Sequence, residues 1–215
     1  MEKRKNISMA VIKRLPKYHR YLNEIMKNDI DRISSKELSE KIGFTASQIR
    51  QDLNCFGDFG QQGYGYNVKA LYNEISNILG LNKSYKSVII GAGNIGQAIA
   101  NYTQFTRLGI SIDGIFDANP KLLGIKINDV EIQDIDELQD FLLENYIDIG
   151  IICVPKINAQ KVCNKLVENG VKGIWNFAPV DLNVPEDVTV ENVHLSESML
   201  TLIYLLNEKN GKNEN

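Results

Sequence analysis

Segment 87–96, with the sequence SVIIGAGNIG, constrains what this 215-residue chain can fold into more than any other stretch. A short β-branched run ends in a Gly-x-Gly-x-x-Gly turn, and a helical pattern follows over residues 97–105. In a strand–turn–helix unit of this kind, Gly91 permits the tight turn, Gly93 lets a pyrophosphate approach the backbone, and Gly96 lets the helix pack on the strand. The segment therefore predicts a dinucleotide-binding unit.

An acidic residue strengthens this prediction. A second apolar run, residues 110–116, leads to Asp117, which lies 21 residues after Gly96. A carboxylate at that position accepts hydrogen bonds from an adenosine ribose and repels a 2′-phosphate, which favours NADH and NAD⁺ over NADPH. The alternative is that Asp117 only caps a turn with Asn119 and Pro120.

The second part of the chain alternates strand and helix patterns. Runs such as 149–154, which are apolar almost throughout, are typical of strands buried on both faces. The alternation predicts an α/β fold, a Rossmann-like doubly wound parallel sheet. We expect strands at 87–91, 110–117, 124–127, 147–154, 171–175 and 189–193, and helices at 94–106, 136–145 and 157–168.

Ligands of such a sheet bind at the carboxyl ends of its strands. Two of these ends, 153–155 and 176–179, offer an apolar wall for a nicotinamide ring, although both can also be plain turns punctuated by proline. Tyr102 shares a helical stripe with Ile95 and Phe105, so its default role is core packing, but we keep it as a candidate. The candidate cofactor residues are Gly91, Ala92, Gly93, Asn94, Ile95, Gly96, Tyr102, Asp117, Val154, Pro155, Phe177, Ala178 and Pro179.

The N-terminal part has a different character. Residues 1–56 carry 12 Lys and Arg against 7 Asp and Glu, whereas the remainder carries 12 against 20. A basic front on an acidic body favours a polyanionic partner for the front. Apolar residues recur at helical spacing from residue 8 to residue 28, and we expect a new helix to begin near Pro16. Capping-box patterns at 34–37 and 45–48 then open two short helices separated by Gly43, which predicts a helix-turn-helix.

The second of these short helices, expected to run to about Cys55, separates its faces. Ala46, Ile49 and Leu53 fall on one side, and the other side carries hydrogen-bonding side chains. In a DNA major groove, glutamine pairs with adenine and arginine with guanine. Two alternatives remain: the polar face can simply be solvated, or its arginine can hold a phosphate without reading a base. The glycines and aromatics of 56–66 predict a hairpin wing, the alternative being a hinge. The candidate DNA-binding residues are Thr45, Ser47, Gln48, Arg50, Gln51, Asn54, Gly60, Gly63, Tyr64 and Gly65.

The last expected helix, 198–207, is apolar except for a stripe of Ser198, Thr201 and Tyr204. A helix apolar over most of its circumference needs cover, so we expect it to insert into a partner subunit. The expected organisation is a winged-helix domain at 1–80, a Rossmann domain at 81–195 with a linker at 81–86, a dimerisation helix at 196–208 and a disordered tail at 209–215.

Composition narrows the setting. The chain is 43% hydrophobic and has neither an apolar run of membrane-spanning length nor a signal peptide, so we expect a cytoplasmic protein. Its three cysteines, Cys55, Cys153 and Cys163, lack the spacing of metal ligands, and we expect buried thiols and no metal. Only two histidines are present, and few residues follow the expected sheet, which argues against a catalytic domain.

These segments resemble the Rex family of redox-sensing transcriptional repressors over nearly the whole chain. The resemblance is carried by residues 48–66, by the Gly91–Gly96 turn, by Phe116-Asp117 and by Asn176-Phe-Ala-Pro179. It implies a homodimer that exchanges C-terminal helices, binds a palindromic operator through winged-helix domains and lets go when NADH binds. Gln51 and Asn54 depart from the family's usual basic residue and serine. His194 and Arg20 stand where relatives often pair an acid with an arginine.

Two other functions fit part of the sequence. The chain can be an NAD-dependent oxidoreductase with an N-terminal appendage, in which Lys156 and Asp181 would be the acid and base, although nothing in the sequence brings them together. It can also be a non-catalytic module that binds coenzyme A or another nucleotide, since that function uses the same fold.

Overall fold

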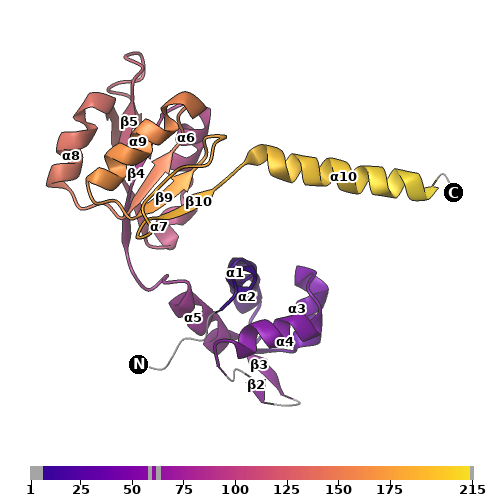
Figure 1. Cartoon of the computed structure of the whole chain (residues 1–215). Helices are drawn as coiled ribbons and strands as arrows, with labels where there is room; N and C mark the ends of the chain where they lie inside the picture. The colour runs from indigo at the N-terminus through magenta and orange to yellow at the C-terminus, as the bar shows by residue number, and fades with distance from the viewer. Residues whose placement is uncertain (1–6, 58–59, 62–63, 214–215) are drawn as a thin grey trace. The chain divides into compact units, whose positions relative to one another are not determined.

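The structure is a computed structural model that describes residues 7–57, 60–61 and 64–213. It divides into two compact units, Met1–Lys83 and Ser84–Asn215. The boundary falls within the expected linker at 81–86. Figure 1 shows the two units joined by a short segment after α5 (Val68–Ile78), and residues 79–82 of this segment form turns.

The N-terminal unit is a helix-turn-helix with a small antiparallel sheet. Its core is built from apolar side chains that recur at helical spacing, among them Leu15, Leu22, Leu38, Ile49 and Leu71, each at most 1% exposed. The sheet has the order β1-β3-β2, and its hairpin is the expected wing. The elements are α1 (Met9–Ile12), α2 (Leu15–Met26), β1 (Arg32–Ile33), α3 (Ser35–Ile42), α4 (Ala46–Asn54), β2 (Gly60–Gln61), β3 (Gly65–Asn67) and α5.

The helices predicted for this unit are present, although α2 ends at Met26 rather than at residue 28 and one of the two predicted capping boxes is incomplete. Pro16 lies in the first turn of α2, and Gly43 ends α3 in the left-handed conformation. Ser34 and Glu37 form the complete capping box of α3. At α4 only half of the box exists: the Thr45 hydroxyl accepts from the Gln48 N–H at 3.1 Å, but the Gln48 side chain is hydrogen-bonded elsewhere.

The second unit is the predicted doubly wound sheet. Its seven strands have the order β10-β9-β8-β4-β5-β7-β6, and all neighbours are parallel except β6 and β7. Strand β7 is not among the predicted strands; it pairs with β6 across a turn in which Asn128 and Asp129 have positive φ. The strands are β4 (Tyr85–Ile90), β5 (Ile110–Asp117), β6 (Lys126–Ile127), β7 (Val130–Asp134), β8 (Ile149–Ile152), β9 (Gly173–Asn176) and β10 (Thr189–Asn192).

Helices cover both faces of this sheet (Figure 1). Alternate residues of β4 show the division: Val88 and Ile90 pack with α8 and α9, whereas Ile89 packs with α6. The helix expected at 94–106 is in fact two, because the chain turns after Ala100. The helices are α6 (Asn94–Ala100), α7 (Gln104–Arg107), the 3-10 turn η1 (Ile135–Glu137), α8 (Leu138–Glu144) and α9 (Lys156–Glu168).

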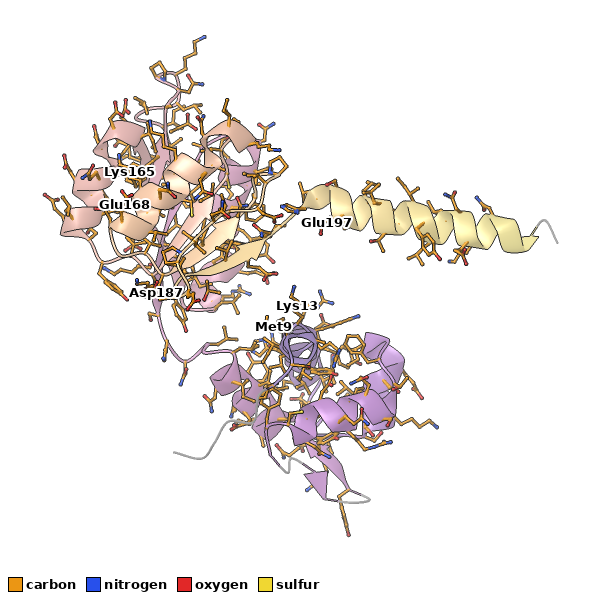
Figure 2. All side chains as sticks on the ribbon, viewed as in Figure 1. Met9, Lys13, Lys165, Glu168, Asp187 and Glu197 are labelled. Carbon is orange, nitrogen blue, oxygen red and sulfur yellow. The ribbon has the colours of Figure 1, made fainter. Side chains whose placement is uncertain are left out.

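The C-terminal helix α10 spans Leu195–Asn213. It is longer than expected, so the described part of the expected tail, 209–213, is helical. Its apolar side chains are about half exposed or more, from 46% at Ile203 to 64% at Leu195, and Figure 2 shows side chains projecting on all sides of the helix. Among the helices that the structure describes, none is long and apolar enough to cross a membrane.

Candidate functional site

The glycine turn between β4 and α6 has the geometry that the sequence predicts. Gly91 has φ +100°, and a Cβ there would lie 2.7 Å from the carbonyl oxygen of Cys153. A Cβ at Gly96 would lie 1.9 Å from the carbonyl oxygen of Gly91, so α6 packs directly on the turn. Gly93 differs, because no atom lies within 4 Å of its ideal Cβ position. Open space therefore lies at the N-terminus of α6, where a phosphate would fit.

Asp117 at the end of β5 is tied to this turn. Its Oδ2 accepts from the Ala92 N–H at 2.6 Å, and its Oδ1 accepts from the Asn119 N–H at 2.7 Å. Asp117 thus does cap the turn that contains Asn119. A carboxylate offers about four lone-pair sites, so these two bonds leave capacity for a ribose hydroxyl.

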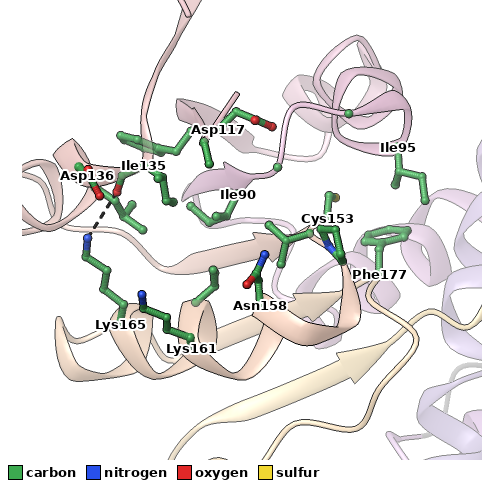
Figure 3. Close-up of a pocket in the computed structure, with 18 of the residues that line it drawn as sticks. Ile90, Ile95, Asp117, Ile135, Asp136, Cys153, Asn158, Lys161, Lys165 and Phe177 are labelled. Carbon is green, nitrogen blue, oxygen red and sulfur yellow. Dashed lines mark hydrogen bonds between the residues drawn. The ribbon is translucent and has the colours of Figure 1, made fainter. Parts of the chain in front are cut away.

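A cavity of about 630 Å³ opens beside the turn, at the carboxyl ends of β4, β5 and β8 and against α9. Figure 3 shows Asp117 and Asp136 toward one end of it and Ile95, Cys153 and Phe177 toward the other. The cavity thus has a polar end and an apolar end. Eight candidate residues line it: Gly91, Gly93, Ile95, Asp117, Val154, Pro155, Phe177 and Pro179.

The apolar end is held by a buried asparagine. Asn176, fully buried at the end of β9, donates from Nδ2 to the Val180 carbonyl at 2.7 Å and to Asn192 Oδ1 at 2.8 Å. Its Oδ1 accepts from the Ala178 N–H at 3.0 Å. These bonds fix the loop that carries Phe177 and Pro179 into the cavity wall. Burial raises the pKa of the Cys153 thiol to about 12, so this side chain is a neutral part of the same wall.

Some candidates lie elsewhere. Ala92, Asn94 and Gly96 shape the turn without lining the cavity, and Ala178 is packed in the core. Tyr102 is not at this site: it is 49% exposed, stacks edge-on with Phe105 and lines a second cavity of about 310 Å³. Because the helix breaks between α6 and α7, Tyr102 does not share one helical stripe with Ile95 and Phe105, as the sequence pattern predicted.

Sequence reasoning missed the polar wall supplied by α9. Asn158, Lys161 and Lys165 line the cavity, and Lys165 Nζ donates to the Ile135 carbonyl at 3.4 Å (Figure 3). Their spacing of three and four residues places them on one face of the predicted helix 157–168. The spacing can be seen in the sequence, but only the order of the strands in the sheet shows that this face of α9 lines the cavity.

Asp117→Ala is expected to narrow the preference for NADH over NADPH by about tenfold, since it removes the acceptor for ribose and the repulsion of a 2′-phosphate. The substitution also frees the Ala92 N–H, so affinity for both nucleotides should fall. The measurement is therefore the ratio of the two dissociation constants, with Asp113→Ala, on the same strand, as control. An unchanged ratio would show that Asp117 only holds the turn.

The described residues contain no group of three His, Cys, Asp or Glu side chains that could hold a metal ion. Cys163 is buried and Cys153 half-buried, but Cys55 is exposed at the end of α4, which corrects the expectation of buried thiols. His194, next to α10, pairs through Nδ1 with Glu197 at 2.8 Å, so a carboxylate does lie near the start of α10.

The polar face of α4 is the second site. Ser47, Arg50, Gln51 and Asn54 are exposed, whereas Gln48 is half-buried and donates to Asp52 Oδ1 at 2.9 Å. A single buried carboxylate, that of Asp52, holds this helix on α2 and its preceding turn. It accepts from Arg14 Nε at 2.6 Å, Arg14 Nη2 at 2.7 Å and the Tyr18 hydroxyl at 2.6 Å.

The wing residues take different places. Tyr64 is 69% exposed, and the Arg32 guanidinium lies 5.9 Å from its ring centroid. Gly65 has φ +69°, and a Cβ there would lie 2.6 Å from the Ile33 carbonyl oxygen, so this glycine serves the packing of β3 on β1. Gly60 lies in β2, and Gly63 lies outside the described residues.

Family models match both units. A model described as "Putative DNA-binding protein N-terminus" matches residues 6–54, and one described as "CoA binding domain" matches residues 82–180. The division of the matches agrees with the two units of the fold. The second match spans the doubly wound sheet from β4 to the end of β9.

Relatives match almost the whole chain. A redox-sensing transcriptional repressor Rex of Clostridium perfringens (strain SM101 / Type A) is 77% identical over 212 residues, 99% of this chain and 100% of the relative. A Rex of Clostridium botulinum (strain Alaska E43 / Type E3) is 75% identical over 209 residues, 97% of this chain and 100% of the relative.

Solved structures agree. The crystal structure of RSP with β-NAD⁺ and operator DNA is 61% identical, has a TM-score of 0.90 and covers 98% of this chain and 97% of its own. RSP with β-NADH is 58% identical, with a TM-score of 0.88 and coverage of 98% and 99%. With this identity across both units, the chain belongs to the Rex family of redox-sensing transcriptional repressors.

Proposed function

We propose that this chain is a transcriptional repressor that binds operator DNA and releases it when NADH binds, so that its activity follows the ratio of NADH to NAD⁺. The observation that carries the proposal is the presence, in one chain, of a winged-helix unit with an exposed polar face on α4 and a Rossmann unit with a cavity of about 630 Å³ beside its glycine turn. The relatives' names and the two ligands of the RSP structures support the same function.

The cavity residues fit a dinucleotide. The open space at Gly93 and the amides of the first turn of α6 would hold the pyrophosphate, and Asp117 would hold the adenosine ribose. Val154, Phe177 and Pro179 would surround the nicotinamide. When bound, the nucleotide supplies a ring that is uncharged in its reduced form and positively charged in its oxidised form. An apolar wall favours the uncharged ring, because a charge there loses its hydration.

Release of DNA by NADH is a linkage effect. NADH must bind the arrangement of the protein that cannot bind DNA more tightly than the arrangement that can. A near-complete switch needs a difference of about 5.5 kcal/mol. Among the described residues, neither Lys156 nor Asp181 lines the cavity, so the acid and base of the oxidoreductase alternative do not converge there. The proposal therefore assigns the nucleotide a regulatory role rather than a catalytic one.

The proposal includes a homodimer. The apolar side chains of α10 are exposed in the single chain, and burying them in a second copy would remove this surface from water. A two-fold dimer binds two half-sites related by the same symmetry, so the operator would be palindromic. A protein that regulates transcription in this way would act in the cytoplasm, where bacterial DNA lies.

The test is a fluorescence-anisotropy titration of the full chain on promoter duplexes, with NADH, NAD⁺, NADPH and coenzyme A added in separate arms. We expect DNA binding to saturate at two chains per duplex. Of the four ligands, only NADH should release the duplex, and it should lower the apparent affinity for DNA by about 100-fold. Failure to bind DNA in every arm would refute the repressor function. Release by coenzyme A in place of NADH would assign the cavity to a different ligand, and turnover of NADH with an aldehyde would make the chain an oxidoreductase.

A further inference from the structure

The polar side chains of α4 do not have equal access to a ligand. We infer that Ser47, Gln51 and Asn54 form the stripe that reads bases, that Gln48 is a positioning residue, and that Arg50 contacts a phosphate. The inference rests on the proposed DNA-binding function and assigns its specificity to three residues. We call Ser47, Gln51 and Asn54 the reading stripe.

Gln48 is committed to the protein. Recognition of adenine by a glutamine uses both the amide oxygen and the amide nitrogen. The nitrogen of Gln48 donates to Asp52 at 2.9 Å, and Asp52 is only 1% exposed. Turning the amide toward a base would take one donor from a buried carboxylate, which is costly. Gln48 therefore helps to hold α4 in place.

Arg50 is committed to a different neighbour. Its Nη1 donates to the hydroxyl of Ser35 at 2.9 Å, in the first turn of α3. Its positive charge also acts on the buried phenol of Tyr66, in β3 of the wing. The guanidinium is thus held by α3 at the side of α4. A cation held there suits a backbone phosphate, which sets the register of the helix without reading sequence.

The reading stripe remains exposed and unengaged. Among the described residues, none forms a hydrogen bond with the side-chain amide of Gln51 or of Asn54, and both residues are exposed, as is Ser47. The spacing of four and three residues places all three within about 60° of one another around the helix. Ile49 and Leu53, which anchor α4 in the core, lie on the opposite side.

The chemistry of the stripe predicts the kind of base it reads. Each of the two amides can donate and accept at once, which is the pattern of the adenine edge in the major groove. Gln51 and Asn54 are separated by about 4.5 Å along the helix axis, which is between one and two base-pair steps of about 3.4 Å. Each half-site should therefore contain two adenines, on A·T pairs that are adjacent or nearly so, whereas serine tolerates several bases.

The test uses the full chain and a library of duplexes with about 20 random base pairs. The wild type is compared with Gln51→Ala, Asn54→Ala and Gln48→Ala, after circular dichroism has shown that each variant is folded. We expect Gln51→Ala and Asn54→Ala each to lower the enrichment of adenine at one position of each half-site by at least about fivefold. Gln48→Ala should weaken binding to all sequences alike and leave the selected sequence unchanged.

A second variant separates positioning from reading. Gln48→Lys keeps a donor for Asp52 but has no acceptor for an adenine amino group, so the wild-type selection should persist. Loss of an adenine position, or a new guanine position, in either Gln48 variant would overturn the inference, as would an unchanged selection in both Gln51→Ala and Asn54→Ala. If the wild type enriches no sequence at all, the proposed DNA-binding function is refuted, and the assignment of the reading stripe is refuted together with it.

Discussion

Replacing Gly93 by alanine is expected to weaken NADH binding by about tenfold or more while leaving the thermal stability of the chain unchanged. Gly93 has φ −72° and ψ −168°, which an L-residue adopts without strain, and no atom lies within 4 Å of its ideal Cβ position. The added methyl group therefore meets no protein atom. It fills the space through which a pyrophosphate would approach the amides of α6.

Gly96→Ala is the matched variant, because it belongs to the same turn but lacks the open space. Its Cβ would lie 1.9 Å from the carbonyl oxygen of Gly91, so the backbone of β4 or α6 must shift. We expect a loss of stability of about 1–3 kcal/mol or more, together with loss of NADH binding. The two variants thus separate a ligand contact from a packing contact.

The measurements are NADH titration by fluorescence, thermal unfolding, and release of DNA by NADH. The Gly93→Ala protein should still bind DNA, since the N-terminal unit is a separate compact unit, but should require more NADH for release. If Gly93→Ala binds NADH as tightly as the wild type, the turn does not hold the pyrophosphate, and the nucleotide must lie elsewhere in the cavity.

The second large effect is expected in the N-terminal unit. Asp52→Asn should lower the free energy of unfolding of this unit by about 3–5 kcal/mol, because it leaves the Arg14 guanidinium facing an uncharged amide. The carboxylate is 1% exposed and accepts from Arg14, Tyr18 and Gln48. Urea unfolding followed by circular dichroism measures the change. Glu40→Gln, on the exposed side of α3, is the control and should shift the transition by less than about 0.5 kcal/mol.

The pH dependence of the same contact has a definite sign. Burial raises the pKa of the Asp52 carboxyl, but the hydrogen bonds from Arg14, Tyr18 and Gln48 outweigh burial and hold the pKa below its usual value. The carboxylate therefore stabilises the fold fully above the unfolded-state pKa, which is about 3.9, and loses this contribution as the pH falls through the lower folded-state value. Asp52→Asn should lack this loss; an equal loss in the variant would assign it to other carboxyls.

Much of the fold was predictable because its signals are local. Capping residues such as Ser34, the left-handed Gly43 and the buried run of β8 depend on their immediate neighbours in sequence, and the structure places each as expected. Prediction was wrong where a neighbour in space decided. The helix after Gly93 ends early at Ala100, whose carbonyl accepts from the Asn128 side chain, and β7 pairs with β5 and β6.

The candidate site likewise has features that local sequence predicts and features that depend on neighbours in space. The places of Gly91, Gly93 and Gly96 in the turn between β4 and α6 follow from their spacing, although the close packing of Gly91 on the Cys153 carbonyl does not. The presence of Lys161 in the cavity wall, and the absence of Tyr102 from it, depend on which helix lies beside which strand end. Strand order is a long-range property that hydrophobic periodicity does not contain.

The sequence by itself determined that this chain has a helix-turn-helix followed by a nucleotide-binding Rossmann sheet, because strand and helix periodicity and glycine spacing are short-range properties. Only the tertiary structure decided which polar residues of α4 are available to a ligand. Gln48 and Gln51 are the same residue type three positions apart, yet one donates to a buried carboxylate and the other is exposed. The difference arises because Asp52 must satisfy its charge within the core, and its donors come from α2 and the turn before it as well as from α4 itself.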